Sequence, residues 1–203
     1  TSAGKKNSLS MEKNFNVISP MATGNGAHVV HKLLERRIPG YHVISYNPYR
    51  TLFPPSLFPI GRSHADNIIH TAPDYAWFFS RKNIPLIITF HNYVLDRFMA
   101  GFSNLAQTIH YRTDLKLFTR LSIREARMIT AVSRFTADLV KKDINLSKEI
   151  RVIYNGVDQN LFIPQNCASP ENKKNIIVLF SGNLTRRKGA QWLIPIAERL
   201  KRN

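Results

Sequence analysis

Cysteine is nearly absent from this sequence, in which Cys167 stands alone. One cysteine excludes an internal disulfide framework and is typical of a reducing compartment, so we expect a cytoplasmic protein. Long apolar runs are also missing: no stretch of 18 residues is predominantly apolar, which excludes a membrane-spanning helix. The opening residues are polar and lack the apolar core of a secretory signal. We therefore expect residues 1–13 to be a leader outside the fold.

Acidic residues are scarce as well, with 13 Asp and Glu against 29 Lys and Arg, for a net charge of +16. Such an excess raises the question of a nucleic-acid partner. However, the charge is spread evenly: residues 1–110, 111–151 and 152–203 carry +6, +5 and +5. Because no basic tract or nucleic-acid motif stands out, we disfavour nucleic acid and expect an anionic ligand or an anionic membrane surface instead.

Short apolar runs alternate with helical patterns along the chain, which predicts an α/β fold with a Rossmann-like, doubly wound parallel sheet. A turn at Ser19-Pro20 should end the first strand, and the four prolines in 46–63 predict an irregular excursion. Arginines and lysines recur every four residues in 105–126, which indicates a solvated helix face. The expected strands are 15–18, 41–44, 67–70, 85–90, 128–132 and 150–153, and the expected helices are 27–36, 75–82, 105–126 and 133–142.

The domain boundaries follow from the same patterns. Residues 14–164 should form one sheet domain, and 165–175 lack periodicity and are expected to be a linker. After the linker, an apolar run at 176–180 predicts a strand and 190–202 predicts a helix. We expect 176–203 to be the truncated start of a second domain.

Two glycines, Gly24 and Gly26, lie between the first strand and the first helix, where small residues allow a ligand to approach the backbone. A tight turn explains them about as well. The third glycine of a dinucleotide fingerprint is missing, and no acidic residue ends the second strand, which disfavours an NAD-dependent oxidoreductase. No metal is expected either: His28, His31 and Glu35 share a helix face without the spacing of a zinc motif.

Several polar residues follow strands and should therefore lie at the crevice where open α/β sheets bind ligands. His91 follows a buried strand and could contact a sugar hydroxyl, or merely close a loop. Ser133, with Arg134 beside it, could contact a ligand or cap a helix. Asn155, in the pair Asn155-Gly156, and Asp158 could line the cleft, or Asn155-Gly156 could form a simple turn in which glycine supplies a positive φ.

The strongest candidate is the basic loop that begins Ser181-Gly182-Asn183 and ends Lys188-Gly189. A lysine at the entry to a helix, beside a glycine, suits a diphosphate, because its ammonium and the helix dipole both favour negative charge. Arg186 and Arg187 add charge nearby. The alternative is a solvated surface turn.

In this order, the motifs resemble glycosyltransferase family 4, whose members have the GT-B fold. The resemblance runs from about residue 14 to the end of the sequence. Its pieces are Gly24-Asn25-Gly26, Thr89-Phe90-His91, Ile129-Thr130-Ala131-Val132-Ser133-Arg134-Phe135, Ile153-Tyr154-Asn155-Gly156-Val157-Asp158 with Phe162, and Phe180-Ser181-Gly182-Asn183-Leu184 through Lys188-Gly189.

The resemblance implies a retaining, metal-independent, hexosyltransferase-like enzyme that moves a sugar from a nucleotide-sugar to an acceptor. It places the acceptor on the first domain, which corresponds to 14–164, and the donor on the second. It implies that Gly26 lies near the donor diphosphate, that His91 lies near the transferred sugar, and that Lys188 holds the diphosphate, with no cofactor. The resemblance also assigns residues to the two sides of the cleft. The diphosphate site includes Gly24, Asn183 and Arg187, and the acceptor side includes Ser133, Arg134, Asn155 and Asp158.

Two departures qualify this expectation. Asn183 stands where the family usually has an arginine, so Arg186 or Arg187 must supply that charge or diphosphate binding is weaker. The paired glutamates of the family would fall after residue 203, so we expect little transferase activity from this chain alone. The acceptor is expected to be a glycan or glycolipid, met at the inner membrane surface by a peripheral protein. The rival hypothesis is a non-catalytic Rossmann-like module that binds an anionic ligand or partner.

Overall fold

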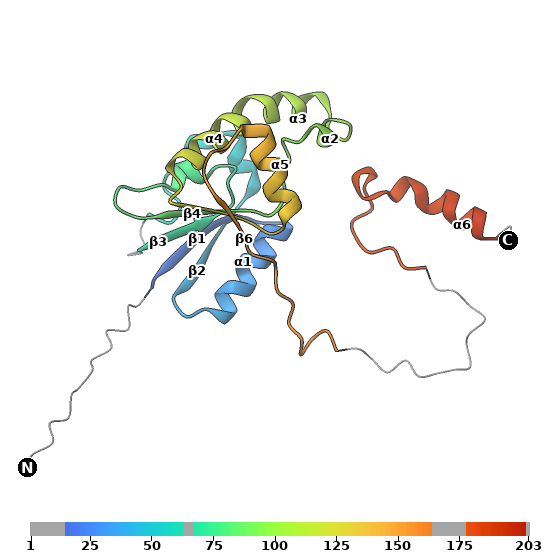
Figure 1. Ribbon diagram of the computed structural model, residues 1–203, viewed down its shortest axis with the longest axis horizontal. Coiled ribbons are helices and arrows are strands. Elements are labelled where there is room, and N and C mark those ends of the chain that lie inside the picture. Colours follow the sequence, from blue (N-terminus) through green and yellow to red (C-terminus); the bar gives the residue numbers. More distant parts are fainter. Residues whose placement is uncertain (1–14, 63–66, 164–177, 202–203) are drawn as a thin grey trace, which may run out of the picture.

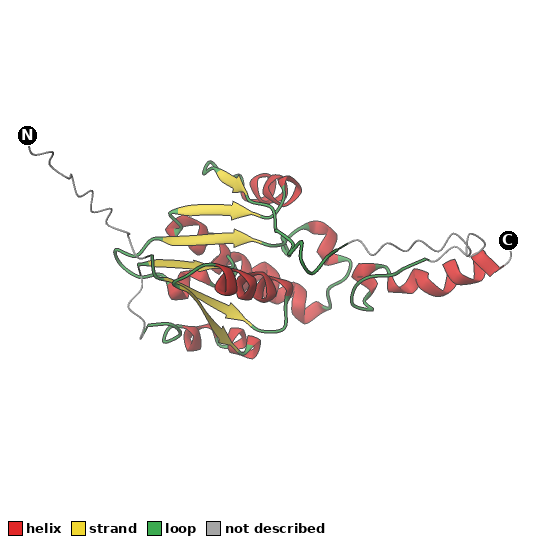
Figure 2. Ribbon diagram, turned by 90° about the horizontal axis from the view of Figure 1, so that it is seen from below, coloured by secondary structure: helices red, strands yellow, loops and turns green. Residues whose placement is uncertain are grey.

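The computed structural model describes residues 15–62, 67–163 and 178–201. Its centre is a six-stranded sheet in the order β2-β1-β3-β4-β5-β6, in which every pairing is parallel. Figure 2 shows the strand arrows pointing the same way. The predicted α/β class and parallel sheet are therefore confirmed. The strands are β1 (Val17–Ala22), β2 (Tyr41–Tyr46), β3 (Ile68–Thr71), β4 (Leu86–Phe90), β5 (Met128–Ala131) and β6 (Ile150–Val152).

The first strand is longer than predicted, because Ser19-Pro20 lies inside β1 and does not end it. A proline lacks the N–H that a strand normally donates. Here the pairing of β1 with β3 covers only Val17 and Ile18, and the Thr71 hydroxyl donates to the Pro20 carbonyl at 2.5 Å. A side chain thus replaces part of the ladder, and the strand continues through the proline.

Helices cover both faces of the sheet (Figure 1), as the doubly wound prediction requires. α1 (Gly26–Arg37) packs on β1 and β2 over a small core of Met21, Tyr41 and Val43. The opposite face carries the larger core, which includes Ile18, Ile69, Ile88 and Ile129. The elements on that side are η1 (Pro48–Leu52), η2 (Pro54–Leu57), η3 (Ala76–Phe79), α2 (Arg97–Ala100), α3 (Leu105–His110), η4 (Tyr111–Leu115), α4 (Lys116–Glu125) and α5 (Arg134–Ile144).

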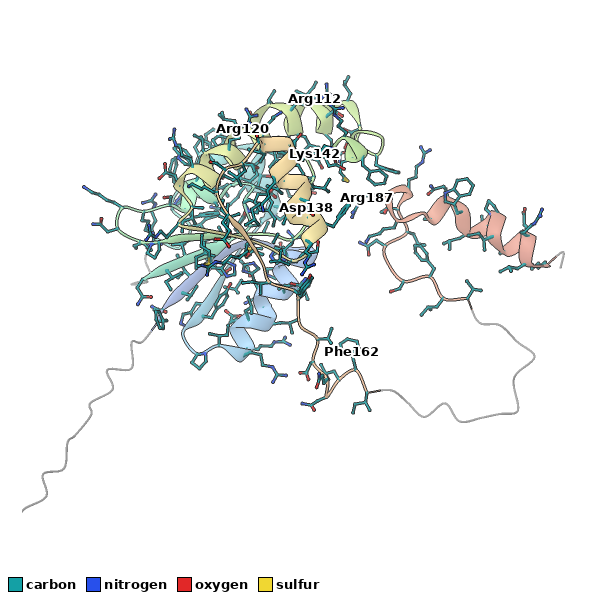
Figure 3. The ribbon with its side chains drawn as sticks, in the orientation of Figure 1. Arg112, Arg120, Asp138, Lys142, Phe162 and Arg187 are labelled. Carbon is teal, nitrogen blue, oxygen red and sulfur yellow. The ribbon has the colours of Figure 1, made fainter. Side chains whose placement is uncertain are left out.

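The predicted helix at 105–126 is confirmed as a nearly continuous arm made of α3, the π-helical turn η4 and α4. Arg112 and Arg120 are exposed on it (Figure 3), as expected for a solvated face. The helix predicted at 75–82 is wrong: only the single 3₁₀ turn η3 forms. Phe78 and Phe79 are both buried, and Asn83 adopts a left-handed φ of 67° at a tight reversal. Burial of consecutive aromatics leaves no solvent face for a longer helix.

The topology fixes where a ligand can bind. β1 lies between β2 and β3, so the chain leaves β1 toward one side of the sheet and continues from β3 toward the other. A crevice opens at such a switch point, outside the carboxyl ends of the strands. The loop that carries Gly24 and the residues that follow β3 meet there.

The C-terminal segment differs from the prediction at its start. Val178–Phe180 form no strand, and the side chains of Val178 and Leu179 are 65% and 85% exposed. A parallel strand needs a neighbour for its N–H and C=O groups, and none lies beside this segment among the described residues. The helix is confirmed in part, as η7 (Ala190–Trp192) followed by α6 (Leu193–Lys201), and the loop before it contains η6 (Arg186–Lys188).

The predicted leader, the whole predicted linker at 165–175 and the domain boundaries beside it lie outside the described residues. Within the parts that are described, no helix is both long and apolar enough to cross a membrane.

Candidate functional site

The glycine loop takes the position that the sequence predicts, between β1 and α1 at the switch point. Gly24 has a φ of +80°, a conformation that favours glycine, so the tight-turn interpretation holds for this residue. Gly26 is the first residue of α1, and a Cβ added to it would meet no atom within 4 Å. Asn25 caps the helix by accepting a hydrogen bond from the His28 N–H at 2.8 Å. Free space therefore lies against the backbone at the positive end of a helix dipole.

Behind this loop, a row of polar side chains crosses the α1 face of the sheet. The imidazole of His31, which is fully buried, lies 2.6 Å from the Ser19 hydroxyl and 2.8 Å from the Tyr41 hydroxyl through its Nδ1. Its Nε2 lies 3.1 Å from Nε2 of His91. The same row continues from the Tyr41 hydroxyl to Nδ1 of His70 at 2.8 Å.

The donor and acceptor of each hydrogen bond can be assigned by starting at the Thr130 end of the row, beyond His70. The Thr130 hydroxyl donates to the Ile88 carbonyl, so its oxygen accepts from Thr89 at 2.6 Å. Thr89 then accepts from Nε2–H of His70 at 2.7 Å. Nδ1 of His70 is left as an acceptor for the Tyr41 hydroxyl.

The assignment continues to His91. With Nδ1–H of His31 shared between the Tyr41 and Ser19 oxygens as acceptors, Nε2 of His31 carries no proton and accepts from Nε2–H of His91. The remaining nitrogen of His91, Nδ1, then holds an unshared lone pair. It is buried and has no hydrogen-bond partner among the described residues. A hydroxyl group is the kind of donor that would complete it.

Burial keeps these imidazoles neutral. Desolvation lowers the pKa of His31 to about 2, with neighbouring histidines acting in the same direction. Desolvation also lowers the pKa of His70 and of His91 to about 4. A neutral imidazole can accept a hydrogen bond, whereas an imidazolium cannot. In the part of the chain that the structure describes, no three His, Cys, Asp or Glu side chains are grouped to hold a metal ion.

The basic loop forms a second, separate feature. Asn183, Arg186, Arg187 and Lys188 line an open pocket of about 610 Å³ whose other wall comes from the segment between α2 and η4, including Phe102. Arg187 is labelled on this C-terminal segment in Figure 3. The pocket gathers three cations that suit an anionic group. His91 does not line this pocket, and neither do Gly24 and Gly26.

The other predicted residues have local roles. Ser133 caps α5, because its hydroxyl accepts from the Thr136 N–H at 3.1 Å, while Arg134 is exposed. The turn predicted at Asn155-Gly156 is wrong: residues 153–158 have no turn, and Gly156 has no positive φ. This stretch instead runs on to Asp158, which pairs with Arg37 at the end of α1.

Comparison with sequence models of protein families shows to which family the chain belongs. The model described as Glycosyltransferase Family 4 matches residues 14–161, which includes the whole sheet. The chain belongs to glycosyltransferase family 4. No curated protein matches it.

Family membership confirms the resemblance found in the sequence and agrees with a Rossmann-like sheet of the GT-B type. It assigns glycosyl transfer as the general activity, with a sugar donor and an acceptor as substrates. The match ends before the basic loop, so the family comparison carries no information about Lys188.

Sequence reasoning missed most of the polar row and one carboxylate, Asp74. The available signal was polar residues at matching places in neighbouring apolar strands: Ser19, His70, Thr89 and Thr130. Asp74 follows β3 by three positions, as His91 follows β4 by one. Its position at the carboxyl end of a central strand could have marked it as a site residue.

Proposed function

We propose that this chain is the acceptor-side part of a retaining, metal-independent glycosyltransferase that moves a hexosyl group from a nucleotide-sugar to a glycan or glycolipid. The observation that carries the proposal is the family match over the whole parallel sheet, whose switch point leaves a glycine loop and a helix N-terminus open to a ligand. The cluster of Arg186, Arg187 and Lys188 supports a diphosphate leaving group.

In the proposed reaction, the bond between the anomeric carbon and the diphosphate oxygen breaks, and a bond from that carbon to the acceptor oxygen forms on the same face. The acceptor proton passes to the departing diphosphate. Lys188 and Arg187 stabilise the negative charge that develops on that diphosphate, a role that fixed cations fill without a metal. His91 accepts a hydrogen bond from a hydroxyl of the transferred sugar through Nδ1.

The proposal is tested with a panel of sugar nucleotides offered to the protein that contains this chain, with transfer followed by mass spectrometry. One donor should be consumed with retention of its anomeric configuration, with and without a chelator. If EDTA abolishes transfer, metal independence is wrong. If no sugar nucleotide is consumed, the rival hypothesis of a non-catalytic module gains.

The 203-residue chain by itself should show little turnover. The apolar side chains of Ile194 and Leu200 in α6 are 72% and 56% exposed, and the cation-lined pocket is open. Catalytic electrostatics need a site closed to water. Robust transfer by this chain alone would contradict the expectation.

We further propose a peripheral position on the cytoplasmic membrane surface. Tyr49, Leu52 and Phe53 are 76%, 78% and 67% exposed on η1 and next to η2, with Arg50 among them. Aromatic and basic side chains together suit the interface of an anionic bilayer. Sedimentation should show more binding to anionic than to neutral vesicles, and equal binding to both would count against this surface.

A further inference from the structure

A second, smaller cavity of about 220 Å³ opens at the switch point itself, and we call it the Asp74 cavity. It lies at the carboxyl ends of β1, β2 and β3, beneath the helical arm. The residues that matter for its chemistry are Asn25, Tyr46, Thr51, Asp74, Tyr75 and Tyr111. Its volume is below the roughly 300–1,000 Å³ of pockets for drug-sized ligands, so it suits a single small ring.

Asp74 gives the cavity an unsatisfied acceptor. Its carboxylate takes part in no hydrogen bond and no ion pair with the residues that the structure describes. Desolvation raises the pKa of Asp74 to about 6. At neutral pH the group is therefore an ionised acceptor, half-buried in the cavity wall and without a donor among the described residues. A partly desolvated carboxylate is stabilised by a hydrogen-bond donor, so a ligand that brings one would bind favourably beside Asp74.

The walls of the cavity are aromatic. Tyr75 and Phe79 are buried at 5% and 2% exposure, and the Tyr46 ring packs at a tilt against Phe79 with ring centroids 5.8 Å apart. The Tyr75 hydroxyl already pairs with Nε2 of His110 at 3.1 Å. The Tyr46 hydroxyl has no such partner in the described part of the chain, and burial, with the nearby Asp74 carboxylate as the second cause, raises its pKa. Aromatic faces beside a few polar groups suit a ring with one apolar face and hydroxyls at its edge.

The Asp74 cavity differs from the pocket at the basic loop in the charge of the side chains that line it. Among the residues that the structure describes, no lysine or arginine lines the Asp74 cavity, whereas three cations line the pocket around Lys188. A phosphate placed beside Asp74 would face a carboxylate with no cation to offset the repulsion. The ligand of the Asp74 cavity should therefore be uncharged.

We propose that the Asp74 cavity binds a neutral monosaccharide ring of the acceptor, with one ring hydroxyl donating to the Asp74 carboxylate and the apolar face of the ring against Tyr75. That this sugar is the acceptor rests on the proposed glycosyltransferase function, whereas the binding of a sugar in the cavity does not depend on it. Asp74 is a specificity-determining residue in this account: it selects uncharged sugars over sugar phosphates.

The test is direct binding of methyl hexosides to the 203-residue chain by saturation-transfer NMR, with the α-methyl glycosides of glucose, galactose and mannose as probes. At least one should bind, and Asp74→Asn, which keeps the shape and removes the charge, should weaken that binding about tenfold or more. Tyr46→Phe removes only a hydroxyl and should weaken it less. Asp138→Asn, which changes an exposed carboxylate on α5 (Figure 3), is the matched control and should leave binding unchanged.

Glucose 6-phosphate supplies the second arm. It should bind more weakly to the unaltered chain than the methyl glucoside does, and Asp74→Asn should narrow that difference. If all three methyl hexosides fail to bind, if Asp74→Asn binds them unchanged, or if the sugar phosphate binds more tightly, the proposal is overturned. Because no sugar nucleotide enters this experiment, its failure and the absence of transferase activity are distinguishable.

Discussion

At the scale of single residues, the buried histidines make the strongest physical statement. His31 is completely buried and accepts or donates hydrogen bonds on both ring nitrogens. In the sequence, His31 shares a helix face with His28 and Glu35, a pattern from which only a metal site was considered and then disfavoured. The polar positions in the strands could have been noticed, but the network of hydrogen bonds could not be predicted, since it depends on how residues of five strands meet under α1.

The depressed pKa of His31 predicts a loss of stability in acid. Between pH 6.5 and about 2 the unfolded chain binds a proton at this position that the folded chain does not, so the free energy of unfolding falls as the pH falls. The slope for one such group is about 1.4 kcal/mol per pH unit. His70 and His91 act in the same direction down to about pH 4, while the raised pKa of Asp74 acts against them.

Urea unfolding between pH 7 and pH 5 measures this dependence. Substitution of His31→Gln should reduce the slope by up to about 1.4 kcal/mol per pH unit, whatever it does to stability at pH 7. His42→Gln changes an exposed histidine of β2 and serves as the control. An unchanged slope in His31→Gln would contradict a neutral buried imidazole.

Substitution of Gly26 can distinguish a structural role of this glycine from a role in ligand binding. It has no positive φ, and its added Cβ would meet no atom, so Gly26→Ala should leave the Tm unchanged or slightly higher. If the donor diphosphate lies against this backbone, the new methyl group occupies its space. We expect the KM for the sugar nucleotide to rise by about tenfold, a loss near 1.4 kcal/mol. A lower Tm with an unchanged KM would refute the ligand role.

At the scale of elements, most strands and helices were predictable, because buried strands of a parallel sheet are short apolar runs. The errors have separate causes. Pro20 remains in β1 because Thr71 supplies a hydrogen bond, and η3 stops early because its aromatics are buried on consecutive positions. Both depend on distant contacts that local patterns do not contain.

Two glycines at element ends should differ in their tolerance of a methyl group. Gly24 and Gly40 share a φ near +80°, which costs an alanine roughly 1–2 kcal/mol. Around Gly24 the space is open, whereas a Cβ on Gly40 would lie 2.3 Å from the carbonyl oxygen of Phe15. Gly40→Ala should therefore destabilise the fold by about 1–3 kcal/mol more than Gly24→Ala in urea unfolding, since backbone must shift. Equal losses would mean that the chain near Phe15 adjusts freely.

At the scale of the whole molecule, the sequence was enough for the family and the fold class, because four motifs between Gly24 and Asp158 occur in order along the residues that the family model matches. It was not enough for the site. Lys188 with its neighbouring arginines and His91 with its histidine partners belong to separate features of the structure, and the Asp74 cavity lies at a third position. The reaction that we propose needs a donor diphosphate, a transferred sugar and an acceptor to be bound together, and we propose one of these three features for each.

Whether Lys188 assists the reaction can be measured as the rate of sugar transfer from a nucleotide-sugar by the protein that contains this chain, compared with its Lys188→Ala variant. Lys188 is exposed, so its loss should leave the fold intact. If Lys188 stabilises the departing diphosphate, kcat should fall by about 10²–10³, the usual effect of removing one group that stabilises developing charge. Transfer at the unaltered rate in a folded Lys188→Ala protein, or no transfer from any sugar nucleotide by the unaltered protein, would contradict the account.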